Sequence, residues 1–399
     1  MKVLMINSVC GIRSTGRICT DLADVLKSRG HECKIAYGRE SVPEKYKKDS
    51  IKIATDLSVK IDALKSRFFD NAGFNSKQNT KKFIEWIKEY NPDVIHLHNL
   101  HGYYINVEIL FEYLKTCGKK IVWTLHDCWA FTGHCAHFDF NECVQWKTGC
   151  KKCAYKYEYP KSLFSQAEYN YKRKQQLFTG LPNLQLIVPS NWMKSMVTQS
   201  YMKAYPIKVL SNGIDLNYFR RDESDFKAKK GLTDRFVILG VASFWNKMKG
   251  LDVFIRLSGD LNREKFQVIL VGNIDKGALS NNILHIPEIN NIQELCKIYT
   301  AADVFVNPTL QETQGLTTVE AFACGTPAIV FNSGGAAECI KEQCGIVVEK
   351  NDYEMLREVI IQMQKGEVDF DSQNCIKAAH QYDAKQLYQE YVKLYESLI

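Results

Sequence analysis

Two carboxylates flanking a predicted helix start are the residues of this sequence best suited to handle a phosphorylated ligand. Glu312 and Glu320 stand eight positions apart, and Gly315 lies between them, where an apolar segment with helical character begins. We expect that helix to stop at Gly325, because a glycine with a proline soon after it is a normal stop signal. On spacing alone, two ordinary surface glutamates explain the same pattern.

The predicted helix start gives these acids a chemical context. The amides of Gly315, Leu316 and Thr317 would lie at the helix N-terminus, where N–H donors and the helix dipole both favour an anion such as a diphosphate. Glu320, about one turn inside the helix, is placed to accept hydrogen bonds from a ribose diol. Glu312, just outside it, would face a sugar carried by that diphosphate.

Histidines follow two predicted strands in the N-terminal half. His126 comes directly after an apolar segment, so we expect it at the carboxyl end of a strand. His96 and His98 end another strand, and strand alternation puts both on one face, with one in the core and the other lining a cleft. The Gly11–Gly16 loop after the first strand lacks the Walker pattern and is weak evidence of phosphate binding.

Five of the fourteen cysteines fall between Cys128 and Cys153. Cys150 and Cys153 have the spacing of a zinc half-site, and Cys135 with Cys143 would supply two further thiolates. The prediction is a structural zinc ion that stiffens a long loop, with no part in catalysis. Buried free thiols or a redox disulfide are the alternatives. The nine scattered cysteines are expected to be small core residues.

The bulk properties are those of a globular protein with two domains. The 399 residues are 45% hydrophobic and 24% charged, and no apolar run reaches the length of a membrane span. The N-terminus resembles a first strand more than a signal peptide, so a cytoplasmic location is expected. Up to residue 205 there are 31 basic and 19 acidic side chains, against 21 and 26 in the remainder. The basic half would suit an anionic membrane surface, a phosphate-bearing acceptor or nucleic acid, or it is a solvated face without a partner.

Strand and helix patterns alternate along the whole chain, which is typical of parallel α/β sheets. Two such series predict two Rossmann-like domains, with the cleft between them as the expected binding site. The predicted divisions are an N-terminal domain at 1–205, which contains a cysteine-rich insertion at 128–153, a second domain at 206–375, and a C-terminal helix at 376–399 that packs back toward the N-terminal domain.

The segment ADVFVNPTLQETQGLTTVEAFACGTPAI closely resembles the donor-site signature of the retaining glycosyltransferases of family 4. Glu312 and Glu320 match the two glutamates of that signature, while Leu316 replaces its more usual phenylalanine. Further segments resemble the family along most of the chain: HECKIAYG, VIHLHNLHG, TLHD, VPSNWM, VLSNGIDLNYF and LGVASFWNKMKGLDVFI. The resemblance implies the two-domain GT-B fold, with an acceptor-binding domain at 1–205 and a nucleotide-sugar-binding domain at 206–375. It also implies a metal-independent sugar transfer from a nucleoside diphosphate.

The same resemblance assigns further site residues. Lys249 matches the phosphate-contacting lysine of the family, and His126 matches a residue that contacts the transferred sugar or positions the acceptor. Gly16, by its position, would approach the donor phosphate or the acceptor. The family usually has an arginine a few residues before Lys249, where this chain has Ser243 or Phe244, and Lys247 is the candidate to replace its charge.

The acceptor implied by the resemblance is a saccharide or a lipid-linked intermediate in surface polysaccharide synthesis, handled by a cytoplasmic enzyme that also associates peripherally with the membrane. No nucleic acid is expected as a partner. Two alternatives stay open: a nucleotide-sugar epimerase of the same fold, and a zinc-containing nucleic-acid-binding protein, which the aromatic residues near the cysteines would suit. A dehydrogenase is disfavoured because no GxGxxG pattern with a downstream acid follows any strand.

Overall fold

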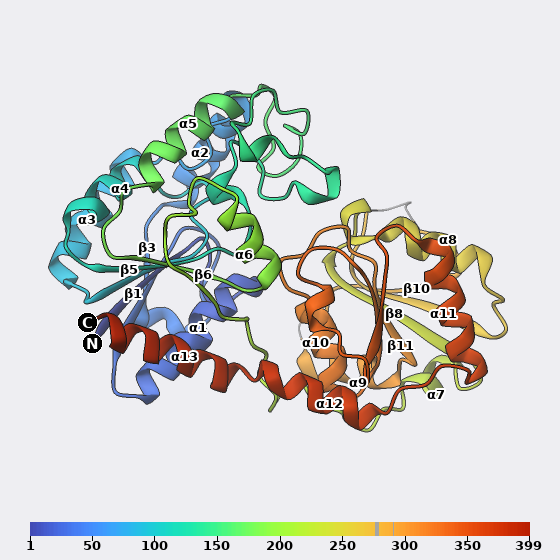
Figure 1. Ribbon diagram of the computed structural model, residues 1–399. Coiled ribbons are helices and arrows are strands. Elements are labelled where there is room, and N and C mark those ends of the chain that lie inside the picture. Colours follow the sequence, from blue (N-terminus) through green and yellow to red (C-terminus); the bar gives the residue numbers. More distant parts are fainter. Residues whose placement is uncertain (276–278, 290) are drawn as a thin grey trace. The chain divides into compact units, whose positions relative to one another are not determined.

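The computed structural model describes residues 1–275, 279–289 and 291–399. The chain divides into two compact units (Figure 1). Unit 1 contains Met1–Ser211 and Leu387–Ile399, and unit 2 contains Asn212–Gln386. The division after Ser211 lies a few residues beyond the predicted boundary at 205. The C-terminal segment 376–399, expected to act as one element, is shared between the units.

Unit 1 is built on a seven-stranded sheet in the order β3-β2-β1-β4-β5-β6-β7, with every neighbouring pair parallel. The strands are short apolar runs whose side chains are mostly buried, as parallel strands covered on both faces require. Their bounds are β1 Lys2–Asn7, β2 Glu32–Tyr37, β3 Ser50–Lys52, β4 Val94–Leu97, β5 Lys120–Thr124, β6 Leu184–Val188 and β7 Ile207–Val209.

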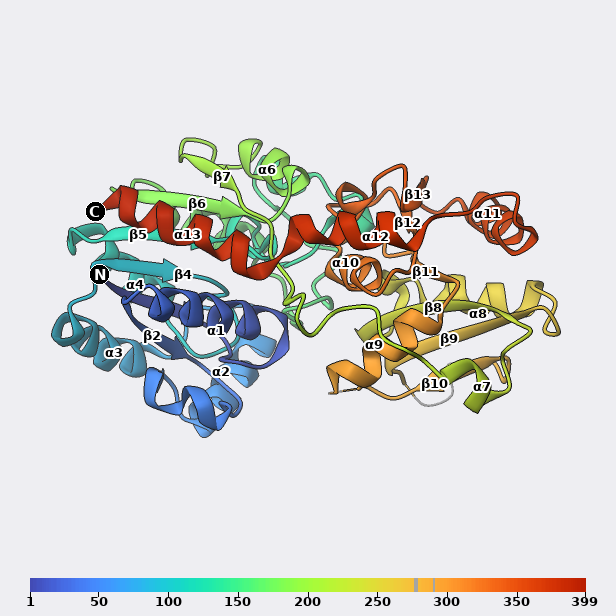
Figure 2. The same ribbon diagram turned by 90° about the horizontal axis from the view of Figure 1, so that it is seen from below.

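Helices cover both faces of this sheet (Figures 1 and 2). One face carries α1 and α13, and the other carries α3, α4 and α5. Phe111 of α4 and Phe178 of α5 pack on Trp123 of β5. The helices are α1 Arg13–Ser28, α2 Asp56–Phe69, α3 Lys77–Tyr90, α4 Val107–Thr116, α5 Ala167–Phe178, α6 Asn191–Thr198 and α13 Ala384–Leu398. Short 3-10 turns lie at η1 Glu44–Asp49, η2 Trp129–Phe131, η3 Asp139–Asn141 and η4 Gln145–Lys147.

Unit 2 holds a second parallel sheet, with six strands in the order β10-β9-β8-β11-β12-β13. Its strands are β8 Phe236–Phe244, β9 Phe266–Asn273, β10 Ile283–Ile286, β11 Val304–Asn307, β12 Ala328–Phe331 and β13 Gly345–Val348. Its helices are α7 Phe226–Lys230, α8 Leu251–Asp260, α9 Ile292–Ala301, α10 Leu316–Ala323, α11 Tyr353–Lys365 and α12 Ser372–Ala379, with 3-10 turns η5 Lys247–Lys249, η6 Ala337–Cys339 and η7 His380–Tyr382. The predicted fold class, two parallel α/β domains, is confirmed.

The first helix begins earlier than the sequence suggested. The loop expected over Gly11–Gly16 is shorter than that, because α1 starts at Arg13 and includes Gly16 in its first turn. A left-handed backbone at Gly11, with φ of +71°, turns the chain sharply after β1 and leaves room for the extra turn. Gly16 is therefore a packed helix residue, whose Cβ would come within 3.2 Å of the Gly11 amide.

The scattered cysteines are mostly core residues, as predicted. Eight of the nine are buried and Cys117 is half-buried. Among the helices of the described residues, none is both long and apolar enough to cross a bilayer.

Candidate active site

The predicted acids of unit 2 lie on the loop and helix that follow β11. The strand ends at Asn307, and the chain then forms a loop that carries Glu312 and leads into α10 with Gly315 as its N-cap. The loop is tied to the turn η5, because Leu310 donates its amide to the Met248 carbonyl at 2.8 Å. The two segments that resemble a donor site are thus brought together at the carboxyl end of the sheet.

Lys249 and Glu312 form an ion pair across this junction, and both side chains are about a quarter exposed. The Asn246 side chain caps the turn η5 by accepting a hydrogen bond of 3.0 Å from the Lys249 amide, which fixes the backbone of Lys249. Gly250 follows with φ of +76°, and a Cβ there would lie 2.5 Å from the Pro308 carbonyl. Only a glycine lets the two segments approach this closely.

Glu320 lies one turn inside α10 and is held by a tyrosine. Its Oε2 accepts a hydrogen bond of 2.9 Å from the hydroxyl of Tyr299, which is buried on α9. Burial, followed by the Glu320 charge, holds the pKa of this hydroxyl well above its ordinary range, so it stays a donor. The carboxylate therefore keeps a fixed orientation with acceptor capacity left over.

The three amides expected at the start of α10 are not equivalent. The Leu316 amide donates to the Gln314 carbonyl at 3.0 Å, and the Gly315 amide is directed at the thiol of Cys339. Gln314 is itself anchored by two hydrogen bonds with the backbone of Asn212, at 2.7 and 2.9 Å. The loop in front of α10 is thus rigidly built, and its N-terminal amides are partly occupied before any ligand arrives.

Lys247 lies on the exposed side of η5, two residues before Lys249. Ser243 and Phe244, at the end of β8, are exposed as well. Lys247 therefore has the freedom to reach a ligand near Lys249, and its proposed part in a phosphate clamp stays a prediction.

The histidines of unit 1 meet at the carboxyl ends of β4 and β5, which confirms the expected placement of His126. His98 Nδ1 lies 2.9 Å from His126 Nε2, and the two rings stack. His96 lies beneath them, bonded through Nε2 to Thr124 at 2.8 Å and through Nδ1 to Tyr395 of α13 at 2.6 Å. His96 and His98 are both buried.

Burial sets the protonation of this group. It lowers the pKa of His126 to about 4, although Asp127 opposes the shift, and it holds the pKa values of His96 and His98 well below their ordinary range. All three imidazoles are therefore neutral near pH 7. Among the described residues, His98 Nε2 has no hydrogen-bond partner.

A histidine–aspartate pair lies beside these histidines. His101 Nε2 is 2.6 Å from Asp127 Oδ2, and His101 Nδ1 is 3.1 Å from the hydroxyl of Tyr159. Asp127 also accepts the Trp129 amide at 2.9 Å. The pair ties the end of β4 to the cysteine-rich loop, which supplies Tyr159.

The four cysteines assigned to zinc line one small pocket together with His134. The Gly133 amide donates to the sulfur of Cys150 at 3.2 Å. Burial holds the pKa of Cys135 above its ordinary range, and the thiols of Cys153, Cys150 and Cys143 raise it further. Within residues 1–275, 279–289 and 291–399, however, no group of three or more metal-ligating side chains has the arrangement of a metal site. The zinc ion stays a prediction.

Comparisons with known proteins identify the family. Residues 15–218 match the model for Glycosyltransferase Family 4, and residues 222–382 match the model for glycosyl transferases group 1. This chain belongs to the GT-B glycosyltransferases. A glycosyl transferase named for colanic acid biosynthesis in Escherichia coli (strain K12) is 24% identical to it over the full length of both chains. A D-inositol 3-phosphate glycosyltransferase of Paenarthrobacter aurescens (strain TC1) is 30% identical, over 36% of this chain and 39% of its own.

Solved structures agree on the fold. The sucrose-phosphate synthase of Thermosynechococcus elongatus superimposes with a TM-score of 0.73 at 15% identity, covering 100% of this chain and 98% of its own. The Anabaena protein HepE in complex with UDP gives a TM-score of 0.69 at 16% identity, with both chains fully covered. The two alternatives, an epimerase and a nucleic-acid-binding protein, are not favoured by these comparisons.

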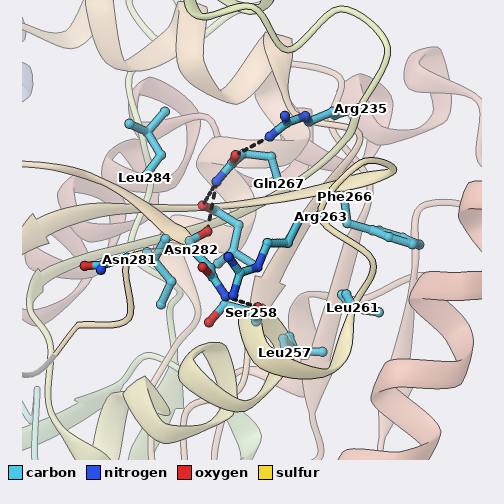
Figure 3. A pocket seen from close by; sticks show the side chains of 12 residues that line it. Arg235, Leu257, Ser258, Leu261, Arg263, Phe266, Gln267, Asn281, Asn282 and Leu284 are labelled. Atoms are coloured by element: carbon cyan, nitrogen blue, oxygen red, sulfur yellow. Dashed lines mark hydrogen bonds between the residues drawn. The ribbon is translucent and has the colours of Figure 1, made fainter.

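A pocket of unit 2 lies away from the residues expected to bind the donor. Figure 3 shows a pocket of about 350 Å³ in unit 2, where Arg235 donates to Gln267 at 3.1 Å. Its lining lies at the amino ends of β8, β9 and β10, the opposite edge of the sheet from Glu312. Open α/β sheets bind their ligands at the carboxyl edge, which favours the Lys249–Glu320 region.

Sequence reasoning missed the partners that orient the site residues of this glycosyltransferase. Tyr299 precedes Glu320 by 21 positions on another helix, and no motif marks it. His98 was one of several histidines, and only the structure pairs it with His126. The contact of Tyr395 with His96 spans 299 positions, beyond any local pattern.

Proposed function

We propose that this glycosyltransferase moves a sugar from a nucleoside diphosphate donor to a saccharide or lipid-linked acceptor, with retention of the anomeric configuration. The observation that carries the proposal is the junction in unit 2, where Lys249 pairs with Glu312 in front of α10 and Tyr299 orients Glu320 one turn inside it. Surface polysaccharide synthesis is the proposed setting, supported by the full-length relative named for colanic acid biosynthesis.

Each residue has a distinct role in binding the donor. The Glu320 carboxylate accepts hydrogen bonds from the ribose hydroxyls while Tyr299 holds it from the other side. Lys249 has three ammonium protons, so it can keep Glu312 and still donate to a phosphate oxygen. Glu312, held at the loop tip, then faces the sugar. Gly315, Leu316 and Thr317 offer the positive end of α10 to the diphosphate.

Transfer breaks the bond between the anomeric carbon and the diphosphate oxygen and forms one to the acceptor oxygen. Negative charge develops on the leaving diphosphate, where Lys249, Lys247 and the start of α10 stabilise it. The acceptor hydroxyl passes its proton to the departing phosphate oxygen, so the protein needs no covalent nucleophile. In this proposal the positive charge comes from the protein, and no metal ion is required for catalysis.

The acceptor is assigned to unit 1, where His126 presents a neutral imidazole held by His98. A neutral ring can accept or donate a single hydrogen bond to a sugar hydroxyl without adding charge. Gly16 is proposed to act through packing, because its missing side chain lets the first turn of α1 lie against the Gly11 amide, beside the place where the donor phosphate or the acceptor is expected. We place the enzyme in the cytoplasm, with peripheral attachment to the membrane through the basic unit 1.

Donor binding is the direct test. Nucleotide sugars with different bases and sugars, including UDP-glucose and GDP-mannose, are screened by thermal shift, and the best donor is then titrated by calorimetry. Glu320→Ala should abolish binding, whereas Tyr299→Phe should weaken it by about tenfold because one hydrogen bond that orients the carboxylate is lost. Glu358→Ala, which removes an exposed glutamate of α11, is the matched control and should bind like the wild type. A wild type that binds no nucleotide sugar, or full binding by Glu320→Ala, contradicts the assignment.

A further inference from the structure

Helix α2 of unit 1 presents its apolar residues outward. Leu57, Ile61, Leu64 and Phe68 recur at the spacing of one helical face, and they are 69%, 46%, 60% and 44% exposed. We call these four residues the α2 face. A surface helix normally turns such a stripe toward the core, so a contiguous exposed stripe calls for a partner.

The opposite side of α2 is polar and buried, which fixes the orientation of the helix. Asp62 and Ser66 are its buried residues. Asp62 Oδ1 accepts hydrogen bonds from Asn75 at 3.0 Å and Ser66 at 3.2 Å, and Oδ2 accepts one from Ser76 at 2.6 Å. Rotating the helix to hide the α2 face would break this network and expose a buried carboxyl group. The outward apolar stripe is therefore a stable feature of the fold.

The α2 face is flanked by positive charge. Lys60, Lys65 and Arg67 are exposed on the same helix, and between Leu57 and Phe69 the only acidic residue is the inward Asp62. The exposed Asp56 at the start of α2 is paired with Lys52 at 2.6 Å, so its charge is balanced by a residue outside the helix. The surface around the α2 face thus combines apolar side chains with a net positive charge. That combination suits an anionic, partly apolar surface.

A neighbouring loop extends the apolar surface. Leu163 and Phe164 are exposed, and the loop is bound to the end of α2 because Leu163 donates its amide to the Arg67 carbonyl at 2.8 Å. Gln166 adds a second link through the Phe69 carbonyl at 2.7 Å. The loop is tied to the helix and carries its apolar residues next to it.

We propose that the α2 face inserts into the headgroup region of an anionic lipid bilayer, with α2 lying in the plane of the membrane surface. The apolar side chains enter the acyl boundary, while the flanking cations contact acidic headgroups. A purely electrostatic attachment by the basic half would need no apolar stripe. An apolar protein partner would gain nothing from three flanking cations, so the two features together select the membrane. This proposal rests on the peripheral attachment proposed above and deepens it by naming the helix that binds the membrane, whereas it does not depend on the donor site.

Vesicle co-sedimentation of the full-length protein tests the proposal without any nucleotide sugar, so its outcome is independent of the donor site. The wild type should sediment with vesicles of phosphatidylglycerol and phosphatidylcholine and only weakly with phosphatidylcholine alone. Ile61→Gln combined with Leu64→Gln, which leaves the charge unchanged, should lower the partition coefficient by about tenfold or more. Lys60→Gln combined with Lys65→Gln should lower it by about fivefold per lysine on anionic vesicles only.

The matched control is Val347→Gln combined with Met355→Gln, which removes two exposed apolar side chains from unit 2 and should leave sedimentation unchanged. Thermal melts of all variants confirm that they fold. The proposal is overturned if the wild type does not bind anionic vesicles, if the Ile61/Leu64 variant binds like the wild type, or if only the lysines matter. It is also overturned if light scattering shows a wild-type dimer that the Ile61/Leu64 variant converts to a monomer, because the α2 face then joins two copies.

Discussion

At the scale of single residues, the donor junction depends on acids that are oriented before any ligand binds. The family resemblance of the sequence singled out Glu312, Glu320 and Lys249, and the predicted helix start between the two glutamates gave these acids a chemical context. The resemblance was not sufficient to find Tyr299, whose hydroxyl reaches Glu320 only because α9 packs beside α10. Pairings of this kind depend on tertiary packing, and no local pattern encodes them.

The buried histidines of unit 1 predict how stability changes with pH. An unfolded histidine titrates near pH 6.5, whereas burial lowers the pKa of His126 to about 4 and holds those of His96 and His98 well below their ordinary range. Between about pH 6.5 and 4 the unfolded chain binds protons that the folded chain refuses, so the free energy of unfolding should fall as the pH is lowered.

Denaturant titrations across this range measure the effect. His126→Asn should show a shallower decline than the wild type, because one of the three groups no longer titrates. A variant at the half-buried His285 of unit 2, whose ring lies 2.7 Å from the Gly272 carbonyl, serves as the comparison. The same slope in His126→Asn and the wild type contradicts the neutral, buried assignment.

At the scale of elements, the sequence predicted what local chemistry determines. The strands Val304–Asn307, Ala328–Phe331 and Gly345–Val348 are short apolar runs rich in β-branched residues, which is the local pattern behind the expected alternation of strands and helices. The start of α1 was wrong, since its position depends on a left-handed turn. The apolar residues of α2 recur at helical spacing, and such a stripe normally faces the core. In α2 the polar side is buried instead, because Asp62 is held inward by its hydrogen bonds with Asn75 and Ser76.

The loop that carries Glu312 depends on Gly334. This glycine has φ of +59°, and a Cβ on it would lie 2.1 Å from the Glu312 carbonyl, which also accepts the Gly335 amide at 2.6 Å. Gly334→Ala should displace the loop, destabilise the protein by about 1–3 kcal/mol and weaken donor binding by about tenfold.

Gly366→Ala is the matched substitution, because Gly366, at the end of α11, has φ of +74° but a Cβ added to it would meet no atom within 4 Å. It should cost about 1 kcal/mol and leave donor affinity intact. Calorimetry with the donor and thermal melts separate the two effects. Equal donor affinity in Gly334→Ala and Gly366→Ala contradicts the proposed role of the loop.

The cysteine-rich loop supports a prediction of its own. Lys174 of α5 is buried and donates to the carbonyls of Trp129 at 2.9 Å and Thr132 at 3.2 Å. Burial lowers the pKa of Lys174 to about 7, and a thiolate cluster with net negative charge beside it would favour the charged form of the lysine. We expect about one zinc ion per chain by mass spectrometry of protein purified without chelators, through Cys135, Cys143, Cys150 and Cys153.

A chelator should then lower the melting temperature of the wild type, and Cys150→Ser should lose the zinc. Cys344→Ser, at a buried cysteine of unit 2, should keep it. Protein that contains no zinc and does not respond to a chelator favours buried thiols, and a change on adding a reductant instead favours a disulfide.

At the scale of the whole molecule, the sequence predicted two α/β units because two series of strands and helices follow each other along the chain. The sequence located the boundary between them only approximately, because tertiary contacts determine it. Unit 1 extends to Ser211 and also includes Leu387–Ile399. The return of α13 brings Tyr391 and Tyr395 onto β4 and β5, where they cover His96. The proposed donor residues belong to unit 2 and the histidines to unit 1.

The most direct test of the account is release of nucleoside diphosphate from the donor that binds best, measured with saccharide and lipid-linked acceptors. The wild type should release nucleotide when a matching acceptor is added. Lys249→Ala should lower the rate by about 10²–10³, as loss of one group that stabilises the leaving diphosphate does, and Lys249→Arg should recover part of it. A Lys249→Ala enzyme that releases nucleotide as fast as the wild type would contradict the central claim that the Lys249–Glu312 junction is the donor site.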